Sequence, residues 1–321
     1  MYYFIVNKSS RTGKAAEIWS SLEKELEKRN VCYELHFTEY GGHATELATK
    51  ICEDTKGIKN VMLFVVGGDG TANEVINGIT DFDRIYFGYI PTGSGNDLGR
   101  GLKISSVNPL QRLATLLDRY GDGSTEIEGE VKDVLNMDLG EVTAADGESR
   151  KFAISSGIGI DADVCKQALT SKLKNFLNAI HLGSATYGIL TVKTLFSMPL
   201  ADGVAHVDGV EDFPLKNMIF TAAMNHACEG GGVPMAPSAT CTDGKLSLCM
   251  VQGIKRFACF LAFPRLLAGK HQNIKGFRLV DCSELVLELD KPMVIHADGE
   301  YVGTESTVSF KCLPGLLKVL V

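Results

Sequence analysis

Three glycines surround a single aspartate in the sequence GGDG at residues 67–70. Glycines let the backbone turn sharply and leave no side chain between the main chain and a ligand. Thr71 and Glu74 follow with the spacing of a capping box, which predicts that Thr71 is the N-cap of a helix. The amides and the dipole of a helix start favour an anion, phosphate above all. An ordinary glycine-rich βα turn has the same composition, so this motif alone leaves both interpretations open.

Asp69 needs a physical reason to stand in a turn that could bind phosphate. A carboxylate beside a phosphate is repelled unless a cation lies between them, and Mg²⁺ is the usual one. We therefore expect Asp69 to reach a Mg²⁺ ion on bound phosphates, either directly or through water.

The elements around this turn predict how it is positioned. Residues 61–66 form an unbroken apolar run, which is typical of a parallel strand buried on both faces. Strands and helices then alternate through about residue 120, which indicates an α/β layer with a largely parallel sheet. The other expected strands cover 2–6, 32–37 and 86–90, and the expected helices cover 15–29, 43–53 and 108–119.

Four polar loops follow the expected strands of this sheet. They begin at Asn7, Thr38, Gly67 and Pro91, and the last one, residues 91–97, is a second turn of small residues. Ligands of parallel α/β sheets bind at the carboxyl ends of the strands. We therefore expect the four loops to meet at one edge, which is stronger evidence for a binding site than any single loop.

The pattern changes after residues 120–129, which have turn composition and no apolar period. We place the domains at 1–125 and 126–311, with residues 312–321 as a segment that could return to the first. Short strands, some of them alternating, predict an antiparallel sheet or sandwich in the second domain. They are expected at 131–142, 152–156, 204–210, 218–224, 246–251, 277–280, 285–289, 293–297 and 307–310, with helical segments at about 161–196 and 256–267.

Composition excludes several classes of protein. The net charge of −7 does not indicate binding to nucleic acid. The nine cysteines are odd in number and form no CxxC pair, which favours buried free thiols in a reducing cytosol. The chain opens without the basic stretch of a signal peptide, and no apolar run is long enough to predict a transmembrane helix.

The segment 67–78, GGDGTANEVING, resembles the nucleotide signature of the diacylglycerol kinase catalytic-domain family. That family includes soluble bacterial lipid kinases and the sphingosine and ceramide kinases. Other segments resemble family motifs in the same order along the whole chain: 7–13, 90–97, 156–161, 182–187, 230–232 with 243–244, 298–300 and 313–319. The chain departs from the usual pattern at Lys8, Arg11, Ser94 and Thr240.

The resemblance implies a fold and an activity. The fold is α/β, with an N-terminal three-layer α/β nucleotide-binding domain like that of NAD kinases and phosphofructokinases, followed by a mainly antiparallel β-sandwich domain that accepts the lipid. The activity is ATP- and Mg²⁺-dependent phosphorylation of a lipid hydroxyl, with diacylglycerol giving phosphatidic acid. Two alternatives stay open: an NAD kinase-like or other small-molecule kinase, and a non-catalytic lipid-binding regulatory protein.

The resemblance also implies site residues. Asp69, Asp298 and Glu300 are the catalytic candidates, with Glu300 as proton acceptor and Asp298 orienting, although the two roles could be exchanged. On an extended segment these two side chains would point the same way, but Asp-Gly is also a strong hairpin-turn signal. Asp243 is a candidate ligand of a structural Mg²⁺. The nucleotide-binding candidates are Asn7, Ser9, Ser10, Arg11, Thr38, Gly67, Gly68, Asp69, Gly70, Thr71, Asn73, Ser94 and Asn96.

Two histidines in apolar strands, His226 and His296, are interpreted as core residues rather than ligands. A lipid substrate implies a cytoplasmic protein that contacts the inner face of a membrane transiently. The expected contact surface is 166–198, where Lys166, Lys172 and Lys174 could meet anionic headgroups and the apolar residues could enter the bilayer. The same residues could instead be a solvated face and part of the core. Similarity to soluble bacterial relatives suggests a homodimer.

Overall fold

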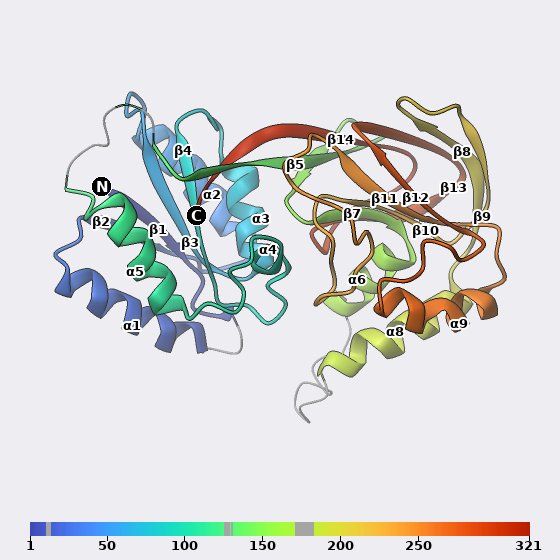
Figure 1. Ribbon diagram of the computed structural model, residues 1–321, viewed down its shortest axis with the longest axis horizontal. Helices are drawn as coiled ribbons and strands as arrows, with labels where there is room; N and C mark the ends of the chain where they lie inside the picture. The colour runs from blue at the N-terminus through green and yellow to red at the C-terminus, as the bar shows by residue number, and fades with distance from the viewer. Residues whose placement is uncertain (11–13, 125–128, 130, 171–182) are drawn as a thin grey trace. The chain divides into compact units, whose positions relative to one another are not determined.

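A computed structural model describes the chain except for residues 11–13, 125–128, 130 and 171–182 (Figure 1). The chain divides into two compact units. Unit 1 comprises Met1–Asp138 and Pro314–Val321, and unit 2 comprises Leu139–Leu313. The division after Asp138 lies later than the sequence-based boundary at residue 125, because the strand β5 (Val134–Ala144) begins in unit 1 and continues into unit 2.

Unit 1 is built on a parallel sheet. Its strands are β1 (Tyr2–Val6), β2 (Tyr33–Phe37), β3 (Val61–Gly67) and β4 (Ile85–Pro91), in the order β4-β3-β1-β2. Every residue of β3 is buried, as its unbroken apolar run predicts. The end of the chain pairs in parallel with β4 through Lys318 and Val319.

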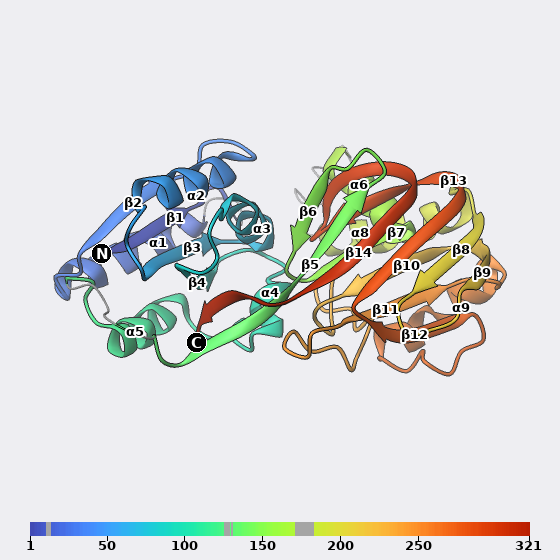
Figure 2. The same cartoon turned by 90° about the horizontal axis from the view of Figure 1, so that it is seen from above.

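Helices cover both faces of this sheet (Figures 1 and 2). One face of β1 and β3 packs on Trp19, Leu22 and Leu26 of α1 (Lys14–Lys28) and on Leu113, Leu116 and Leu117 of α5 (Pro109–Tyr120). The other face is covered by α2 (His43–Asp54) and α3 (Asp69–Gly78), which pack on each other. These layers confirm the three-layer α/β domain, in which α4 (Asp97–Gly101) is a short helix after β4.

Unit 2 is mainly antiparallel. Within it the strand order is β12-β11-β10-β7-β13-β14, and β8 joins β13 to β9 while β5 joins β14 to β6. The strands are β5, β6 (Ser149–Phe152), β7 (Ser155–Gly159), β8 (Ala201–Val207), β9 (Phe213–Met218), β10 (Phe220–Met224), β11 (Leu246–Val251), β12 (Phe277–Cys282), β13 (Glu284–Ala297) and β14 (Glu300–Leu320).

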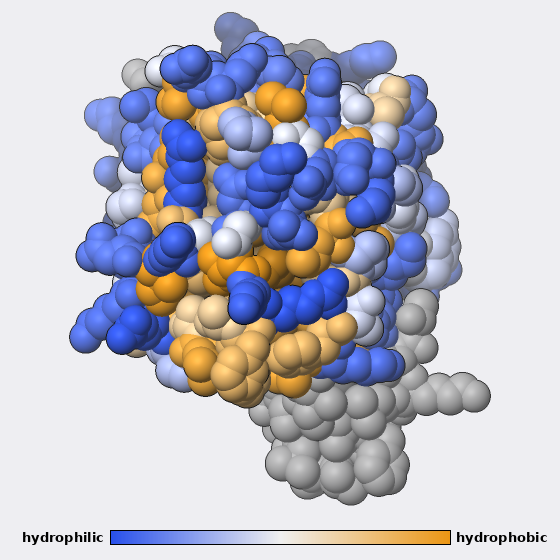
Figure 3. All heavy atoms as spheres, turned by 90° about the vertical axis from the view of Figure 1, so that its right-hand side faces the viewer, coloured by the Kyte–Doolittle hydropathy of each residue, from blue (hydrophilic) through white to orange (hydrophobic). Residues whose placement is uncertain are grey.

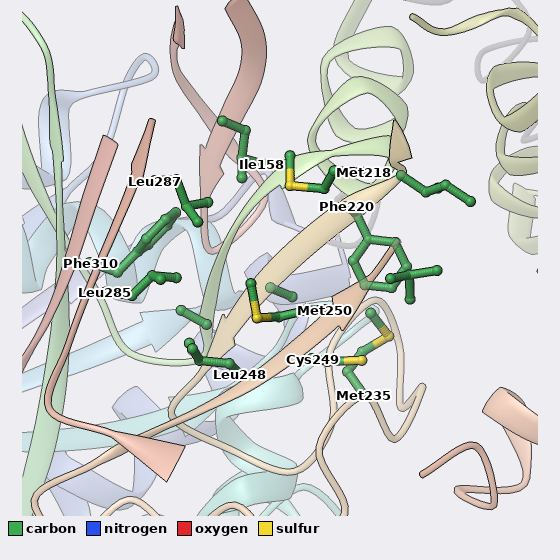
Figure 4. Close-up of a cluster of buried hydrophobic side chains, with 14 of the residues drawn as sticks. Ile158, Met218, Phe220, Met235, Leu248, Cys249, Met250, Leu285, Leu287 and Phe310 are labelled. Atoms are coloured by element: carbon green, nitrogen blue, oxygen red, sulfur yellow. The ribbon is translucent and has the colours of Figure 1, made fainter. Parts of the chain in front are cut away.

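The core of unit 2 contains aliphatic, aromatic and sulfur side chains from these strands (Figure 4). Ile158, Met250, Leu285 and Phe310, which come from four different strands, are all fully buried. Three helices are described in this unit: α6 (Ile160–Thr170), α8 (Gly183–Ser197) and α9 (Arg256–Leu267). Strands β6 and β9 were not predicted, because their polar residues and the proline of β9 hide the apolar alternation of a strand.

All nine cysteines are free thiols, and five of them are buried. The exceptions include Cys32, which is exposed. In the part of the chain that the structure describes, no helix is both long enough and apolar enough to cross a membrane.

Candidate functional site

Three loops of unit 1 meet where β1, β3 and β4 end. The Asn7 side chain, just after β1, donates from Nδ2 to Thr71 Oγ1 at 3.0 Å. The hydroxyls of Ser10 and Thr92 are 3.0 Å apart. The amide of Thr92 also donates to the carbonyl of Gly67 at 2.8 Å. The parallel sheet therefore brings these loops to one edge, as its topology requires.

Two glycines let the loops after β3 and β4 touch. A Cβ on Gly93 would lie 2.7 Å from the Cα of Gly68, and a Cβ on Gly68 would lie 3.3 Å from the Cα of Gly93. The contact at Gly93 is with backbone, which cannot rotate away as a flexible side chain could. The small-residue turns are therefore needed for packing between the loops, whether or not a ligand is bound.

The prediction that Thr71 is an N-cap is wrong. Helix α3 already begins at Asp69, and its N-cap is Gly68, whose extended backbone (φ −91°, ψ −177°) makes no side-chain capping bond. Thr71 instead accepts the hydrogen bond from Asn7, and Glu74 accepts one from the amide of Ala44 at 3.2 Å. The helix starts directly at the end of β3, so its first-turn amides belong to the glycine turn itself and still favour an anion there.

Asp69 is held by the loop after β4. Its Oδ2 accepts from the amide of Asp97 at 2.9 Å, and its Oδ1 accepts from the amide of Leu98 at 3.1 Å. The phenol of Tyr89 donates to Oδ1 at 3.4 Å. Burial, reinforced by the negative charge of Asp69, raises the pKa of Tyr89 well above its ordinary value, so the phenol keeps its proton. Asp69 therefore caps α4 and is fixed in position.

Asp97 is a second carboxylate beside the glycine turn, and the sequence analysis did not identify it as a site residue. It lies in the expected turn at 91–97, beside Asn96, and it pairs with Arg100. A Cβ on Gly95 would lie 3.3 Å from Asp69 Oδ2 and 3.8 Å from Asp97 Oδ2, so both carboxylates lie close to Gly95. The signal in the sequence was a charged residue at the end of a glycine turn after a buried strand.

This donor set fits Mg²⁺ of the kind that binds with a nucleotide. Among the described residues there is no group of three or more His, Cys, Asp or Glu side chains arranged to hold a metal. Mg²⁺ at nucleotide sites, however, is usually held by one or two carboxylates together with substrate phosphates and water. Asp69 and Asp97, beside a helix start that favours phosphate, meet that requirement.

The other nucleotide-binding candidates have different surroundings. The amide of Thr38 donates to the carbonyl of Val6 at 3.0 Å, which places Thr38 beside the end of β1. Ser94 is exposed, whereas Asn73 is fully buried and accepts from Asn77. Arg11 lies outside the described residues.

Two further candidates shape the loops themselves. Asn7 Oδ1 accepts from the amide of Ser9 at 3.0 Å. Asn96 has a left-handed backbone (φ 51°) and donates from Nδ2 to the carbonyl of Gly93 at 2.9 Å. These contacts close the two turns, so both asparagines position the loop backbone.

In unit 2, Asp298 is a structural anchor. Asp298 and Gly299 have positive φ angles of 49° and 86° and form the two-residue turn between β13 and β14, so of the two interpretations of this tripeptide the hairpin turn is the one observed. The Asp298 carboxylate accepts from the amides of Ala153 and Ile154, both at 2.8 Å, and of Ser155 at 3.0 Å. Its oxygens are therefore engaged in joining the turn to the start of β7.

Glu300 is the first residue of β14 and pairs with Ala297 across the turn. It is partly exposed, whereas the neighbouring His296 is buried. Asp298 is partly exposed as well, but its carboxylate is engaged by three backbone amides.

His296 is buried and pairs with Asp161. The sequence analysis did not identify Asp161 as a site residue. His296 Nε2 lies 3.3 Å from Asp161 Oδ2, and the amide of Gly299 donates to Nδ1 at 3.2 Å. In the neutral ring, Nε2 therefore carries the hydrogen. Burial alone would lower the pKa of His296, but the hydrogen bond and charge of Asp161 outweigh it and raise the pKa. A Cβ on Gly157 would lie 1.8 Å from Asp161 Oδ2, so only glycine leaves room for this pair.

The remaining candidates of unit 2 are less informative. His226 is buried, and desolvation lowers its pKa to about 4. Asp243 is exposed and accepts from the amide of Lys245 at 3.1 Å, as in an ordinary turn. Lys166 lies over the ring of Tyr301 at 4.3 Å. The expected membrane-contact residues Lys172 and Lys174 lie outside the described part of the chain.

Comparison with known proteins defines the class. A parallel α/β unit followed by an antiparallel β unit is the fold that this chain shares with solved structures titled as a putative diacylglycerol kinase and an NAD kinase. Residues 1–123 match the family model described as "Diacylglycerol kinase catalytic domain". Residues 154–321 match "YegS C-terminal NAD kinase beta sandwich-like domain". The chain belongs to the diacylglycerol kinase catalytic-domain family.

The similarity to known proteins extends over nearly the whole chain. The chain is 29% identical to "Putative lipid kinase YtlR" of Bacillus subtilis over 94% of each protein. It is 24% identical to "Diacylglycerol kinase" of the same organism over 87% of each. A crystal structure titled as that of a "putative diacylglycerol kinase" from Bacillus anthracis superposes with a TM-score of 0.70 at 20% identity, covering 99% of this chain and 96% of that one. The superposition establishes the fold.

Proposed function

We propose that this protein is a lipid kinase that transfers the γ-phosphoryl group of ATP to the hydroxyl of a lipid, with diacylglycerol as the substrate and phosphatidic acid as the product. The observation that carries the proposal is the pair of carboxylates, Asp69 and Asp97, that both lie close to Gly95, next to the glycine turn and the start of α3. Relatives that carry the name diacylglycerol kinase support the choice of substrate.

The nucleotide phosphates would lie against residues 67–71, where the first-turn amides of α3 stabilise negative charge. Asn7 holds Thr71 in place, and Ser10 and Thr92 tie the first loop to the loop after β4. Phosphoryl transfer depends mainly on positioning and on stabilising the charge of the transferred group. The contacts among these three loops supply that fixed geometry.

Asp69, together with Asp97, would hold Mg²⁺ with the nucleotide. The ion would neutralise charge on the phosphates as the phosphoryl group leaves. Because two backbone amides fix Asp69, its carboxylate needs little rearrangement when the ion binds. Asp243, whose carboxylate makes an ordinary turn contact, is not proposed as a site for a second ion.

Glu300 would take the proton from the lipid hydroxyl, which is a poor nucleophile at neutral pH. Its partly exposed side chain can reach a substrate, whereas the carboxylate of Asp298 is engaged by three backbone amides. Asp298 would therefore orient the turn that presents Glu300. This division of labour assigns each carboxylate a different role that mutagenesis can separate.

A substrate panel tests the proposal. The purified protein is incubated with labelled ATP, with and without Mg²⁺, and with mixed micelles of diacylglycerol, ceramide, sphingosine or undecaprenol, or with NAD. We expect Mg²⁺-dependent label in a lipid, highest with diacylglycerol, and none from the Asp69→Asn variant run in parallel. Label in NAD alone would establish the small-molecule kinase instead. Lipid binding without label in any acceptor would establish a non-catalytic lipid-binding protein.

A lipid acceptor also implies where the protein works. We propose a cytoplasmic protein that contacts the inner face of the membrane transiently. Fractionation of cells that express a tagged chain tests this location.

A further inference from the structure

Helix α9 has an unusual composition for a helix at the surface of a unit. Its sequence, RFACFLAFPRLL, contains only two polar residues, Arg256 and Arg265. A surface helix normally buries one apolar stripe and exposes a polar face. In α9, Ala262 and Leu266 are buried, but Phe257 is 62% exposed and Leu261 is 61% exposed. Its outward face is therefore as apolar as its buried face.

The exposed apolar side chains continue onto α8. The ring centroids of Phe257 and Phe260 are 6.5 Å apart, and those of Phe260 and Phe196 are 6.4 Å apart. Of the eleven large apolar side chains that are exposed in the described part of the chain, six lie on these two helices. We call them the α8–α9 face: Val192, Phe196, Phe257, Phe260, Leu261 and Leu267. Figure 3 views this side of unit 2 and shows apolar surface gathered in its lower part, interrupted by hydrophilic atoms.

The α8–α9 face is held firmly in place. Arg256 donates from Nη1 to the carbonyl of Leu195 at 3.0 Å and from Nη2 to the carbonyl of Met198. These bonds tie the start of α9 to the last turn of α8 and the residue after it. Leu195 and Leu266 anchor the two helices in the core of unit 2. The aromatic side chains are therefore exposed on two helices that are firmly packed in unit 2.

The stretch of sequence that contains α9 carries only positive charges. Between Asp243 and Asp281 the chain contains no Asp or Glu but seven Lys and Arg residues, although the whole chain has a net charge of −7. Lys255, Arg265 and Lys270, at or near the ends of α9, are exposed. An apolar face flanked by these cations complements a surface of anionic headgroups over an apolar interior.

We propose that the α8–α9 face docks unit 2 on an anionic phospholipid bilayer, with its aromatic and leucine side chains at the headgroup boundary and the cations on lipid phosphates. The choice of a bilayer rests on the proposed lipid substrate. A second copy of the chain is a poorer fit, because a two-fold interface would bring identical cationic surfaces together. The cations at the ends of α9 favour an anionic partner instead. The bilayer offers both the anionic and the apolar chemistry at once.

Co-sedimentation with vesicles tests this surface. Wild-type protein is compared with Phe257→Ser/Leu261→Ser on vesicles of phosphatidylcholine mixed with phosphatidylglycerol and on vesicles of phosphatidylcholine alone. We expect the variant to lose at least roughly tenfold in partitioning, because two apolar side chains no longer enter the boundary. The matched control is Leu110→Ser/Val210→Ser, which changes two exposed apolar residues that do not belong to this face and should bind like wild type.

A second variant tests how much the positive charges contribute to vesicle binding. Lys255→Glu/Lys270→Glu should weaken binding to the anionic vesicles several-fold, should weaken it little on phosphatidylcholine, and should lower the salt dependence of binding. The proposal is overturned if Phe257→Ser/Leu261→Ser binds anionic vesicles like wild type. It is also overturned if that variant only converts a dimer to a monomer in light scattering, which would make the face an interface between copies.

An activity measurement keeps this result separate from the proposed function. A short-chain diacylglycerol below its micelle concentration needs no bilayer, so Phe257→Ser/Leu261→Ser should phosphorylate it at the wild-type rate. If the wild-type protein phosphorylates the soluble substrate but does not bind anionic vesicles, only the docking proposal fails. Vesicle binding without phosphorylation of any lipid would defeat only the kinase.

Discussion

The Asp69 carboxylate caps the helix that begins at Asp97, with Oδ2 at 2.9 Å from the amide nitrogen of Asp97. One side chain therefore joins the glycine turn after β3 to the turn after β4. The negative charge of Asp69 is stabilised by two amides and the phenol of Tyr89 before any ligand arrives. This arrangement gives Asp69 a structural role beside the proposed catalytic one, and the two roles can be measured separately.

The first prediction concerns the charge of Asp69. Asp69→Asn keeps one oxygen as an acceptor for the α4 amides, so we expect a loss of only about 1 kcal/mol in the free energy of unfolding. Turnover should fall about 100-fold or more, because the charge that would meet Mg²⁺ is lost. Urea unfolding and kcat are measured on the same preparation. The control is Asp122→Asn, another aspartate that accepts from a backbone amide, in a turn away from the three-loop site. Near-normal kcat in Asp69→Asn would contradict the proposed metal role.

The second prediction separates the two carboxylates of the DGE tripeptide. Glu300→Gln should abolish most turnover and leave the melting temperature nearly unchanged, because its side chain is partly exposed. Asp298→Asn should cost about 1–3 kcal/mol of stability, because an amide group cannot accept from all three backbone donors. Thermal melts and initial rates of both variants distinguish the roles. An inactive but fully stable Asp298→Asn would reverse the assignment and make Asp298 the proton acceptor.

The third prediction concerns the contact between Gly93 and Gly68. Gly93→Ala adds a Cβ that would lie 2.7 Å from backbone, so the two loops must move apart. We expect the dissociation constant for Mg-ATP to rise about tenfold or more, because the phosphate-binding turn loses its fixed geometry. The control is Gly41→Ala, also in unit 1, where a Cβ meets nothing within 4 Å. Equal nucleotide affinity in the two variants would show that the loop contact does not shape the binding site.

The fourth prediction concerns the pH dependence of stability. Desolvation lowers the pKa of His226 to about 4, against an ordinary value of 6.5. Between these values the unfolded chain binds a proton that the folded chain excludes, so the free energy of unfolding falls as pH decreases. This histidine alone accounts for a loss of up to about 3 kcal/mol from pH 6.5 to pH 4. Urea unfolding across this range measures the slope, and His226→Leu should flatten it.

A second buried histidine, His296, acts in a different pH window. The pKa of His296 is raised, so its stabilising contribution is complete below pH 6.5 and is lost as pH rises through the folded-state value. The difference in slope between wild type and His226→Leu below pH 6.5 therefore isolates His226. An unchanged slope in that variant would mean that His226 is accessible to protons in the folded protein.

The sequence by itself determined the parallel strands of unit 1, the glycine turns at their ends and the helix at 256–267. Each of these depends on residues that are close together in the chain: an unbroken apolar run, three glycines in four positions, a stretch without strand alternation. The order of motifs along the chain was also sufficient to indicate the family. Local signals suffice here because a strand that is buried on both faces requires an apolar run, and a sharp turn requires glycine.

Only the tertiary structure decided what the individual side chains do. Asp69 accepts from an amide 28 residues later, and Asp298 accepts from one 145 residues earlier, so neither partner can be read from local spacing. Capping-box spacing misplaced the helix start at Thr71, because Thr71 is engaged by Asn7 from another strand end. The apolar composition of α9 was visible in the sequence, but whether Phe257 faces the core or the solvent depends on how the helix packs.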